Sequence, residues 1–106
     1  MDIEKYTVII TPTAYREINR IYEYLEFELY AENATKELMK NIEEKIQQLK
    51  EMPKIYPKIE ISNELQREYR RIIINNYIIL YTIEEKNKQV FISYMYYRRK
   101  NYFDNK

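Results

Sequence analysis

Apolar residues recur at helical spacing along two stretches in the first half of the chain. The first stripe follows Thr11 and Pro12, and a threonine N-cap followed by proline is a typical helix start. This stripe consists of Ala14, Ile18, Ile21, Leu25 and Leu29. The second stripe has the same spacing and consists of Ala34, Leu38, Ile42, Ile46 and Leu49. Residues 30–33 separate the two stripes, and so short a break predicts an antiparallel helical hairpin.

Strand patterns lie on both sides of the predicted hairpin. Residues 6–10 are rich in β-branched side chains and predict a first strand. Pro53 and Pro57 end the helical pattern, and a polar connector then runs to about residue 66. Three more strands are predicted at 69–74, 77–83 and 90–96, of which the second is nearly all apolar and therefore central. Asn75 and Asn76 form the turn between the first two, since asparagine tolerates the left-handed conformation in a chain without glycine.

These elements predict one α+β domain over residues 1–106, in the order β-α-α-β-β-β. The helical hairpin is expected to pack on a mostly antiparallel sheet. A chain of 106 residues, 45% of them hydrophobic, can bury one core but has no room for a second domain. The N-terminus lacks the pattern of a signal peptide, and the longest apolar run is far too short to span a bilayer. We therefore expect a cytoplasmic protein without membrane contact.

The missing residue types limit the chemistry that the chain can perform. Cysteine is absent, which excludes disulfides and thiolate metal sites. Histidine is absent too, which removes the usual base near neutral pH, the commonest metal ligand and every Ser-His or Cys-His nucleophile pair. We predict neither a metal site nor a cofactor.

Charge is divided unevenly between the two halves of the chain. Residues 1–53 hold 7 basic and 11 acidic side chains, a net charge of 7 − 11 = −4. Residues 54–106 hold 11 basic and 6 acidic side chains, a net charge of 11 − 6 = +5. The second half is therefore suited to an acidic partner or a phosphate backbone, although an ordinary solvated surface explains the charge equally well.

Four stretches of sequence carry a family resemblance along nearly the whole chain. They are YTVIITPTA at 6–14, the residues Ile46, Leu49, Met52, Pro53 and Tyr56, YRRIIINNYIILY at 69–81, and Val90-Phe91-Ile92 leading to Tyr96-Tyr97-Arg98-Arg99. Their order and spacing resemble the RelE/ParE superfamily. The resemblance implies a growth-inhibiting toxin of a type II toxin–antitoxin system, of the kind that serves plasmid stabilisation, held inactive by a cognate antitoxin.

The superfamily has two kinds of target, and the shared fold does not separate them. RelE-like members are endoribonucleases that cut mRNA on the ribosome, whereas ParE-like members inhibit DNA gyrase and have no known catalytic activity. A third alternative is an interaction module of the same fold that has lost its toxicity.

Two positions favour the ParE-like branch. The middle strand of RelE-like nucleases reads aromatic, arginine, apolar, and that arginine stabilises charge on the scissile phosphate. Here Ile78 occupies the arginine position. On the preceding strand Arg70 fills the first of two alternating basic positions, but Ile72 fills the second. The ending Tyr-x-Arg-Arg also resembles ParE-like toxins, although Tyr97 stands where that branch usually has a small residue.

Candidate binding residues follow from this interpretation. We expect the target, DNA gyrase or alternatively the ribosome and its mRNA, to be contacted by Arg70, Tyr96, Arg98 and Arg99. No catalytic residue is assigned, but a nuclease would have to use Arg70, Arg71, Tyr96 and Arg98. Arg71 is the better candidate of the two strand arginines for a solvated or ion-paired side chain, with Glu60, Glu64 or Glu68 as its partner.

Aromatic residues of the first helix form the candidate antitoxin site. Tyr22, Tyr24, Phe27 and Tyr30 exceed what one buried stripe can hold, so some are expected to be exposed until a partner covers them. The antitoxin segment is expected to fold on binding and to pair with the basic second half. Either a homodimer or a toxin–antitoxin heterotetramer is compatible with the sequence.

Overall fold

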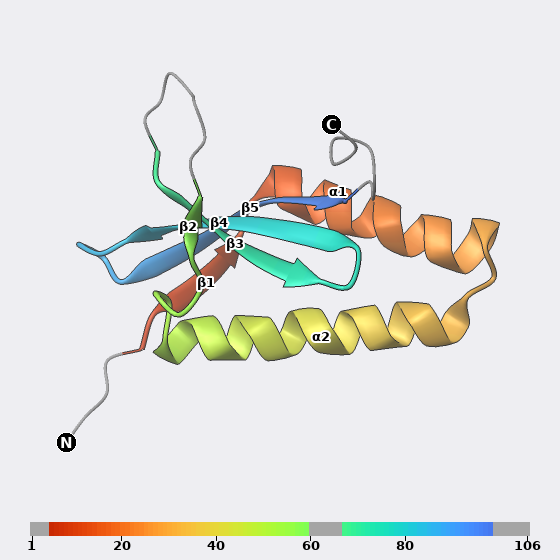
Figure 1. Ribbon diagram of the computed structural model, residues 1–106, viewed down its shortest axis with the longest axis horizontal. Helices are drawn as coiled ribbons and strands as arrows, with labels where there is room; N and C mark the ends of the chain where they lie inside the picture. The colour runs from red at the N-terminus through yellow and green to blue at the C-terminus, as the bar shows by residue number, and fades with distance from the viewer. Residues whose placement is uncertain (1–4, 60–66, 99–106) are drawn as a thin grey trace, which may run out of the picture.

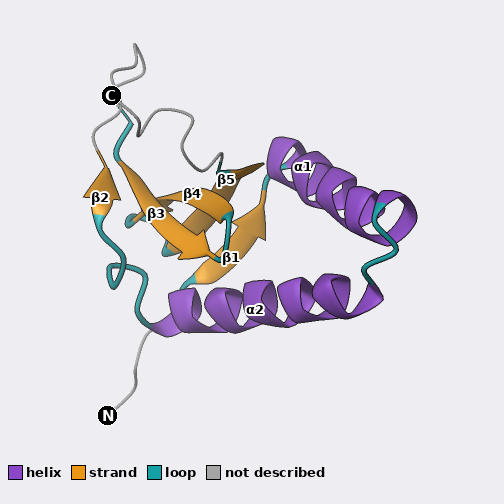
Figure 2. Ribbon diagram, turned by 45° about the vertical axis from the view of Figure 1, so that its right-hand side comes forward, coloured by secondary structure: helices purple, strands orange, loops and turns teal. Residues whose placement is uncertain are grey.

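The protein combines two α-helices with a five-stranded sheet. Figures 1 and 2 show that the helices pack on one face of the sheet. The computed structural model describes residues 5–59 and 67–98. Its elements are β1 (Thr7–Ile10), α1 (Pro12–Glu23), the π-helix η1 (Tyr24–Glu28), α2 (Glu32–Glu51), β2 (Lys58–Ile59), β3 (Tyr69–Ile74), β4 (Tyr77–Glu84) and β5 (Gln89–Tyr97). The α+β prediction of a helical hairpin on a mostly antiparallel sheet is confirmed. Among the described residues, no helix is long and apolar enough to cross a membrane.

The strands lie in the order β1-β5-β4-β3-β2. β1 runs parallel to β5, and the other three pairs are antiparallel, which leaves β4 in the centre as its apolar sequence predicts. β2 was not predicted. It contributes only Lys58 and Ile59 to the edge of the sheet, and two residues give too little alternation for a pattern to indicate a strand.

The core lies between the helices and one face of the sheet. It contains Ala14, Ile18 and Leu25 from the first helical segment, Leu38, Ile42 and Leu49 from α2, and Ile72, Ile74, Ile79, Tyr81, Val90, Ile92 and Met95 from β3, β4 and β5. A β-bulge maintains this arrangement. Leu80 pairs with Tyr94 and its neighbour Tyr81 pairs with Ile92, so Ser93 is the extra residue and both Ile92 and Met95 face the helices.

The first predicted helix is interrupted by a π-turn, which changes one end of its buried stripe. The predicted N-cap is confirmed, since the Thr11 Oγ1 accepts a hydrogen bond from the Ala14 N–H at 3.2 Å. At the other end, the Leu29 N–H bonds to the carbonyl of Tyr24, five residues earlier. This wider turn rotates Leu29 out of the stripe, and the side chain is 52% exposed. The prediction that Leu29 is buried is therefore wrong.

α2 begins at Glu32, within the predicted break, and its first turn also departs from the predicted stripe. Ala34 is exposed, whereas the neighbouring Thr35 is buried. The Thr35 hydroxyl donates to the Ala31 carbonyl at 3.1 Å, and this bond satisfies the polar group inside the core. The predicted turn is confirmed, because Asn75 has a positive φ of 52°.

Candidate partner-binding surfaces

The sheet face opposite the helices presents mainly apolar and aromatic side chains. β3 contributes Tyr69, Arg71 and Ile73, and cross-strand pairs place Ile73 beside Ile78 and Ile78 beside Tyr96. Tyr69, Ile78 and Leu80 form a small cluster that is separate from the main core. Ile73, Tyr94 and Tyr96 are exposed. We call the seven residues Tyr69, Arg71, Ile73, Ile78, Leu80, Tyr94 and Tyr96 the open face.

Ile72 and Ile78, the two positions that favoured the ParE-like branch, lie on opposite faces of the sheet. Ile78 belongs to the open face, as the comparison with nucleases requires. Ile72 lies on the opposite face and is fully buried against the helices. The absence of a basic side chain at Ile72 therefore says nothing about a phosphate site, and that part of the sequence argument is wrong. Among the seven residues of the open face, Arg71 is the single basic side chain.

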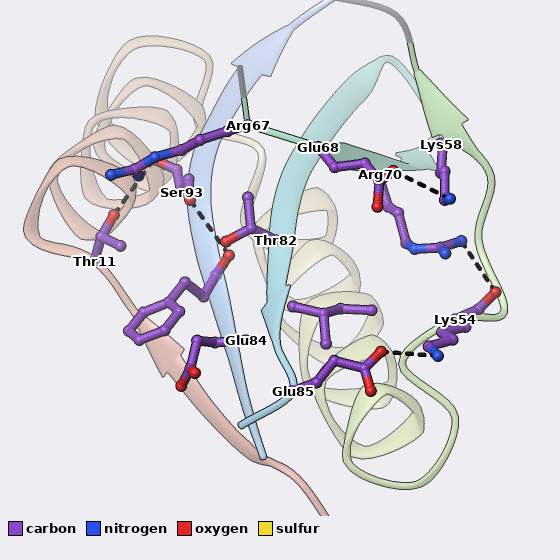
Figure 3. A pocket seen from close by; sticks show the side chains of 12 residues that line it. Thr11, Lys54, Lys58, Arg67, Glu68, Arg70, Thr82, Glu84, Glu85 and Ser93 are labelled. Atoms are coloured by element: carbon purple, nitrogen blue, oxygen red, sulfur yellow. Dashed lines mark hydrogen bonds and ion pairs between the residues drawn. The ribbon is translucent and has the colours of Figure 1, made fainter. Parts of the chain in front are cut away.

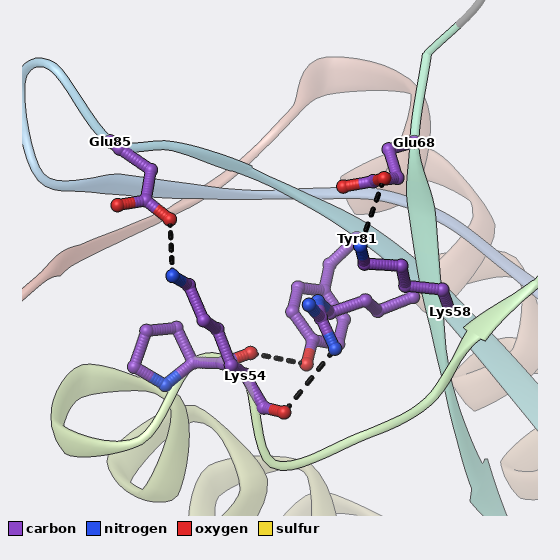
Figure 4. A network of polar contacts seen from close by, with 7 residues as sticks. Lys54, Lys58, Glu68, Tyr81 and Glu85 are labelled. Atoms are coloured by element: carbon purple, nitrogen blue, oxygen red, sulfur yellow. Dashed lines mark hydrogen bonds and ion pairs between the residues drawn. The ribbon is translucent and has the colours of Figure 1, made fainter.

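Arg70 forms hydrogen bonds with the connector between α2 and β2, residues 52–57. Its guanidinium donates to the carbonyls of Lys54 at 3.2 Å and Tyr56 at 2.6 Å. Tyr81, the cross-strand partner of Arg70, donates its hydroxyl to the buried carbonyl of Pro53 at 2.6 Å. Figure 4 shows the Tyr81 side chain reaching this connector from β4.

These contacts make Arg71, and not Arg70, the better candidate of the two strand arginines for contact with the target. Arg70, expected to meet the target, is held by two main-chain carbonyls, whereas Arg71 is exposed on the open face. Glu68, one of the partners considered for Arg71, instead pairs with Lys58 at 3.1 Å. Glu60 and Glu64 lie outside the described residues.

Several tyrosines are held in their protonated form. Burial raises the pKa of Tyr81 to about 12, although the nearby Arg70 charge opposes the shift. Burial is also the main cause of the raised pKa values of Tyr22, Tyr69 and Tyr77. A raised pKa means that less of the side chain is ionised near neutral pH, so these four groups are unsuited to act as a tyrosinate base.

A polar cavity of about 830 Å³ lies beside this connector (Figure 3). Its walls carry cations and carboxylates in nearly equal number: Lys54, Lys58, Arg67, Arg70, Glu68, Glu84 and Glu85. The Lys54–Glu85 pair is 2.8 Å apart, and this hydrogen bond raises the pKa of Lys54 and lowers that of Glu85. One buried oxygen, Glu84 Oε1, accepts no hydrogen bond. With its charges balanced in this way, the cavity does not attract phosphate as a cluster of unpaired cations would.

A second surface lies at the tip of the helical hairpin. Tyr24, Phe27, Leu29 and Tyr30 are all exposed, Tyr30 to 84%, and we call these four residues the hairpin patch. Tyr22, which the sequence placed with them, is half-buried. A groove of about 740 Å³ adjoins the patch between α1 and β5 and has mainly apolar walls. We call it the α1–β5 groove; its walls are Glu17, Arg20, Ile21, Tyr24, Leu25, Leu29, Tyr77, Met95, Tyr96 and Tyr97.

The remaining candidate residues lie at the end of β5. Tyr96 is on the open face, and Arg98, directly after the strand, is exposed. Arg99 lies outside the described residues. In the part of the chain that the structure describes, no three acidic side chains gather as a metal site would require.

Comparison with known proteins assigns the family. The family described as "ParE toxin of type II toxin-antitoxin system, parDE" matches residues 8–102, which is most of the chain. The chain belongs to the ParE toxin family. It is thus a member of the RelE/ParE superfamily and a toxin of a type II toxin–antitoxin system, as the resemblance implied. A search of curated protein sequences gave no match.

Two solved structures have the same fold as this ParE-family toxin. The RelBE2 toxin–antitoxin complex of Mycobacterium tuberculosis contains a chain that is 20% identical, with a TM-score of 0.62, and the match covers 92% of this chain and 95% of that one. A chain of the chromosomal ParDE system of P. aeruginosa is 12% identical, with a TM-score of 0.66 and coverage of 91% and 99%.

Two features of this ParE-family toxin escaped the sequence reasoning. The Glu17 carboxylate of α1 accepts a hydrogen bond from the Met95 N–H of β5 at 2.7 Å, a contact between residues 78 positions apart. Ile73 and Leu80 complete the open face, but their apolar character suits a core equally well. Only the alternation relative to the buried Ile72 assigns Ile73 to the outside, and the sequence does not indicate which of the two faces the helices cover.

Proposed function

We propose that this toxin inhibits DNA gyrase by binding to it and that a cognate antitoxin neutralises it. The observation that carries the first part is the composition of the open face. Ile73, Ile78 and Leu80 occupy its centre, and Arg71 is the basic side chain that the described part of β3–β5 offers there. An apolar and aromatic surface with so little charge suits contact with a protein.

An endoribonuclease needs features that the described part of this face lacks. RNA binding relies on several cations along the phosphate backbone. The reaction also builds charge on the phosphate, and losing one preorganised donor costs roughly two to three decades in rate. Ile78 takes the position of such a donor, and the open-face Tyr69 has a raised pKa. Both observations support inhibition by binding.

The hairpin patch supports the second part of the proposal. Four exposed apolar and aromatic side chains in seven residues are costly to leave in water, and a partner that covers them removes that cost. RelBE2 and ParDE are toxin–antitoxin systems with the same toxin fold, which makes an antitoxin the partner of choice. We infer that the antitoxin segment orders itself on this patch.

The target is tested by adding the purified toxin to a gyrase supercoiling reaction and, separately, to ribosomes programmed with mRNA. We expect loss of supercoiling and an intact message. Ile73→Ser should weaken the inhibition, because it places a hydroxyl in the apolar open face. Met39→Ser is the matched control, since Met39 is similarly exposed but lies on α2.

Three results would contradict parts of the proposal. Cleavage of the message at codon-defined positions with unaffected supercoiling would identify a ribosome-dependent nuclease. No effect in either reaction, and none on growth, would identify an interaction module without toxicity. Failure to co-purify with the small protein encoded beside it would remove the antitoxin.

A further inference from the structure

The edge of β5 that faces α1 has a strand partner along only part of its length. β1 pairs with β5 from Gln89 to Ile92 and then ends, and Thr11 adds a last main-chain hydrogen bond to the Ile92 carbonyl at 3.0 Å. β5 itself continues to Tyr97. No strand of the described residues pairs with this edge beyond Ile92. The second half of β5 is therefore an unpaired edge, a place where an added strand can bind.

A side chain occupies part of the place of the missing strand. The Met95 N–H points to this edge and donates to the Glu17 carboxylate at 2.7 Å. Because the N–H groups of successive strand residues point to opposite edges, the Tyr97 N–H points to the same edge as that of Met95. The Arg98 N–H accordingly points the other way and donates to the Asn76 carbonyl beside β4. Glu17 thus satisfies one edge donor that a strand would otherwise satisfy.

The α1–β5 groove lies directly along this unpaired edge. Its volume of about 740 Å³ is within the range of roughly 300–1,000 Å³ that is typical of ligand pockets, and its walls include Ile21, Leu29 and Tyr77. Leu29 belongs both to the groove and to the hairpin patch. A strand added to β5 would place alternate side chains in this groove, and its chain could continue onto the patch.

The charge beside the groove selects the chemistry of such a strand. A strand that takes over the Met95 N–H leaves the half-buried Glu17 carboxylate without this hydrogen bond, and a buried charge without a partner is costly. A lysine or arginine on the incoming strand removes that cost. The groove walls also carry Arg20, so the need for a cation comes from Glu17, the side chain that loses its hydrogen bond.

We propose that the α1–β5 groove receives an extended, basic segment of the antitoxin, which pairs with the edge of β5 at Met95 and Tyr97 and neutralises Glu17. This proposal rests on the proposed function, and it refines the expectation that the antitoxin pairs with the basic second half of the chain. The segment on the groove carries positive charge and apolar side chains, whereas any segment that reaches the basic half carries negative charge.

Hydrogen exchange on the co-purified complex tests the added strand. The amide protons of Met95 and Tyr97 should exchange at least about tenfold more slowly in the complex than in the toxin alone. Val90 and Ile92 serve as the internal control, because β1 and β4 already pair with this part of β5. Unchanged exchange at 95 and 97 in a complex that forms would overturn the proposal but leave the toxin–antitoxin pairing intact.

Charge variants test the basic segment by isothermal titration of the antitoxin. Glu17→Lys should raise the Kd at least about tenfold, because it sets two cations against each other in the groove. Glu17→Gln retains a hydrogen-bond acceptor for Met95, so it should raise the Kd by about threefold with an unchanged melting temperature. Glu44→Lys is the matched control, an exposed charge reversal on α2.

The remaining outcomes are also decisive. Equal Kd values for wild type, Glu17→Gln and Glu17→Lys would overturn the basic segment. Protection of Tyr97 in the toxin alone, together with a dimeric mass, would show that a second copy fills the groove instead. If no complex forms with the neighbouring protein, the antitoxin itself fails, and this proposal fails with it.

Discussion

Replacing Tyr81 by phenylalanine isolates one buried hydrogen bond that connects the sheet to the end of α2. The ring of Tyr81 is completely buried, and its hydroxyl donates to the Pro53 carbonyl at 2.6 Å. Phenylalanine retains the ring packing, including the edge-to-face contact with Tyr56, and removes only the donor. Pro53 is itself buried, so its carbonyl loses this partner in a place that water does not readily reach.

The magnitude follows from that unsatisfied acceptor. A typical buried hydrogen bond contributes about 1 kcal/mol, but leaving its partner buried and unpaired costs about 1–3 kcal/mol. We expect the free energy of unfolding of Tyr81→Phe to fall by about 2 kcal/mol. For a domain of this length that is a drop of roughly 10 °C in melting temperature, at about 4–8 °C per kcal/mol.

The same variant has a signature at alkaline pH. The pKa of Tyr81 is about 12 in the folded protein, against the ordinary tyrosine value of 10.0 that applies to the unfolded chain. Because the folded-state value is the higher one, the contribution of Tyr81 to stability is fully present below pH 10 and is lost as the pH rises from 10 to about 12. Wild type should therefore lose stability more steeply than Tyr81→Phe over this interval.

Urea unfolding at neutral pH and at several values between pH 9 and 12 measures both effects. Tyr15→Phe is the matched control, since it makes the same chemical change at an exposed site on α1 and should leave stability within about 0.5 kcal/mol of wild type. If Tyr81→Phe is as stable as Tyr15→Phe, the hydroxyl does not hold the connector and the reasoning is wrong.

Three further predictions use the same unfolding assay. Thr11→Ala should destabilise the protein by about 1 kcal/mol, since it removes the N-cap of α1 and the contact of its hydroxyl with the Ser93 carbonyl; an unchanged midpoint would contradict this. Arg70→Ala should lower the free energy of unfolding by about 1–3 kcal/mol, because two main-chain carbonyls lose their hydrogen-bond donor, whereas Arg71→Ala should lower it by less than about 0.5 kcal/mol. The reverse order would again make Arg70 the better candidate for contact with the target. The double variant Arg98→Ala, Arg99→Ala should change stability by less than about 0.5 kcal/mol yet reduce growth inhibition, and full toxicity would remove these arginines from the target site.

The parts of the fold that sequence predicts are those with strong local chemistry. Thr11-Pro12 indicates the start of α1, Asn75 supplies the positive φ of a turn, and the run from Tyr77 indicates a central strand. Each of these signals depends on residues a few positions apart. Local patterns therefore determine the elements and their order.

The parts that it missed depend on contacts between distant residues. The π-turn at Tyr24–Glu28 follows a helical pattern that continues to Leu29, so nothing in the spacing marks the rotation that exposes Leu29. On β3 both faces are apolar, with Ile72 on one and Ile73 on the other, so alternation alone cannot say which meets the helices. The contact between Glu17 and Met95 depends on how α1 lies along β5, which no local pattern specifies.

The extra residue in β5 has a consequence for how relatives of this toxin are aligned. Ser93 divides the strand into two segments of opposite phase, one ending at Ile92 and one running from Tyr94 to Tyr97. Removing that single position would turn Met95 toward solvent and bring Tyr94 and Tyr96 under the helices. An ungapped alignment with a relative that has a regular strand would thus equate the interior of one protein with the exterior of the other. Residue roles near the end of β5 can be transferred between such proteins only after the bulge has been located in each.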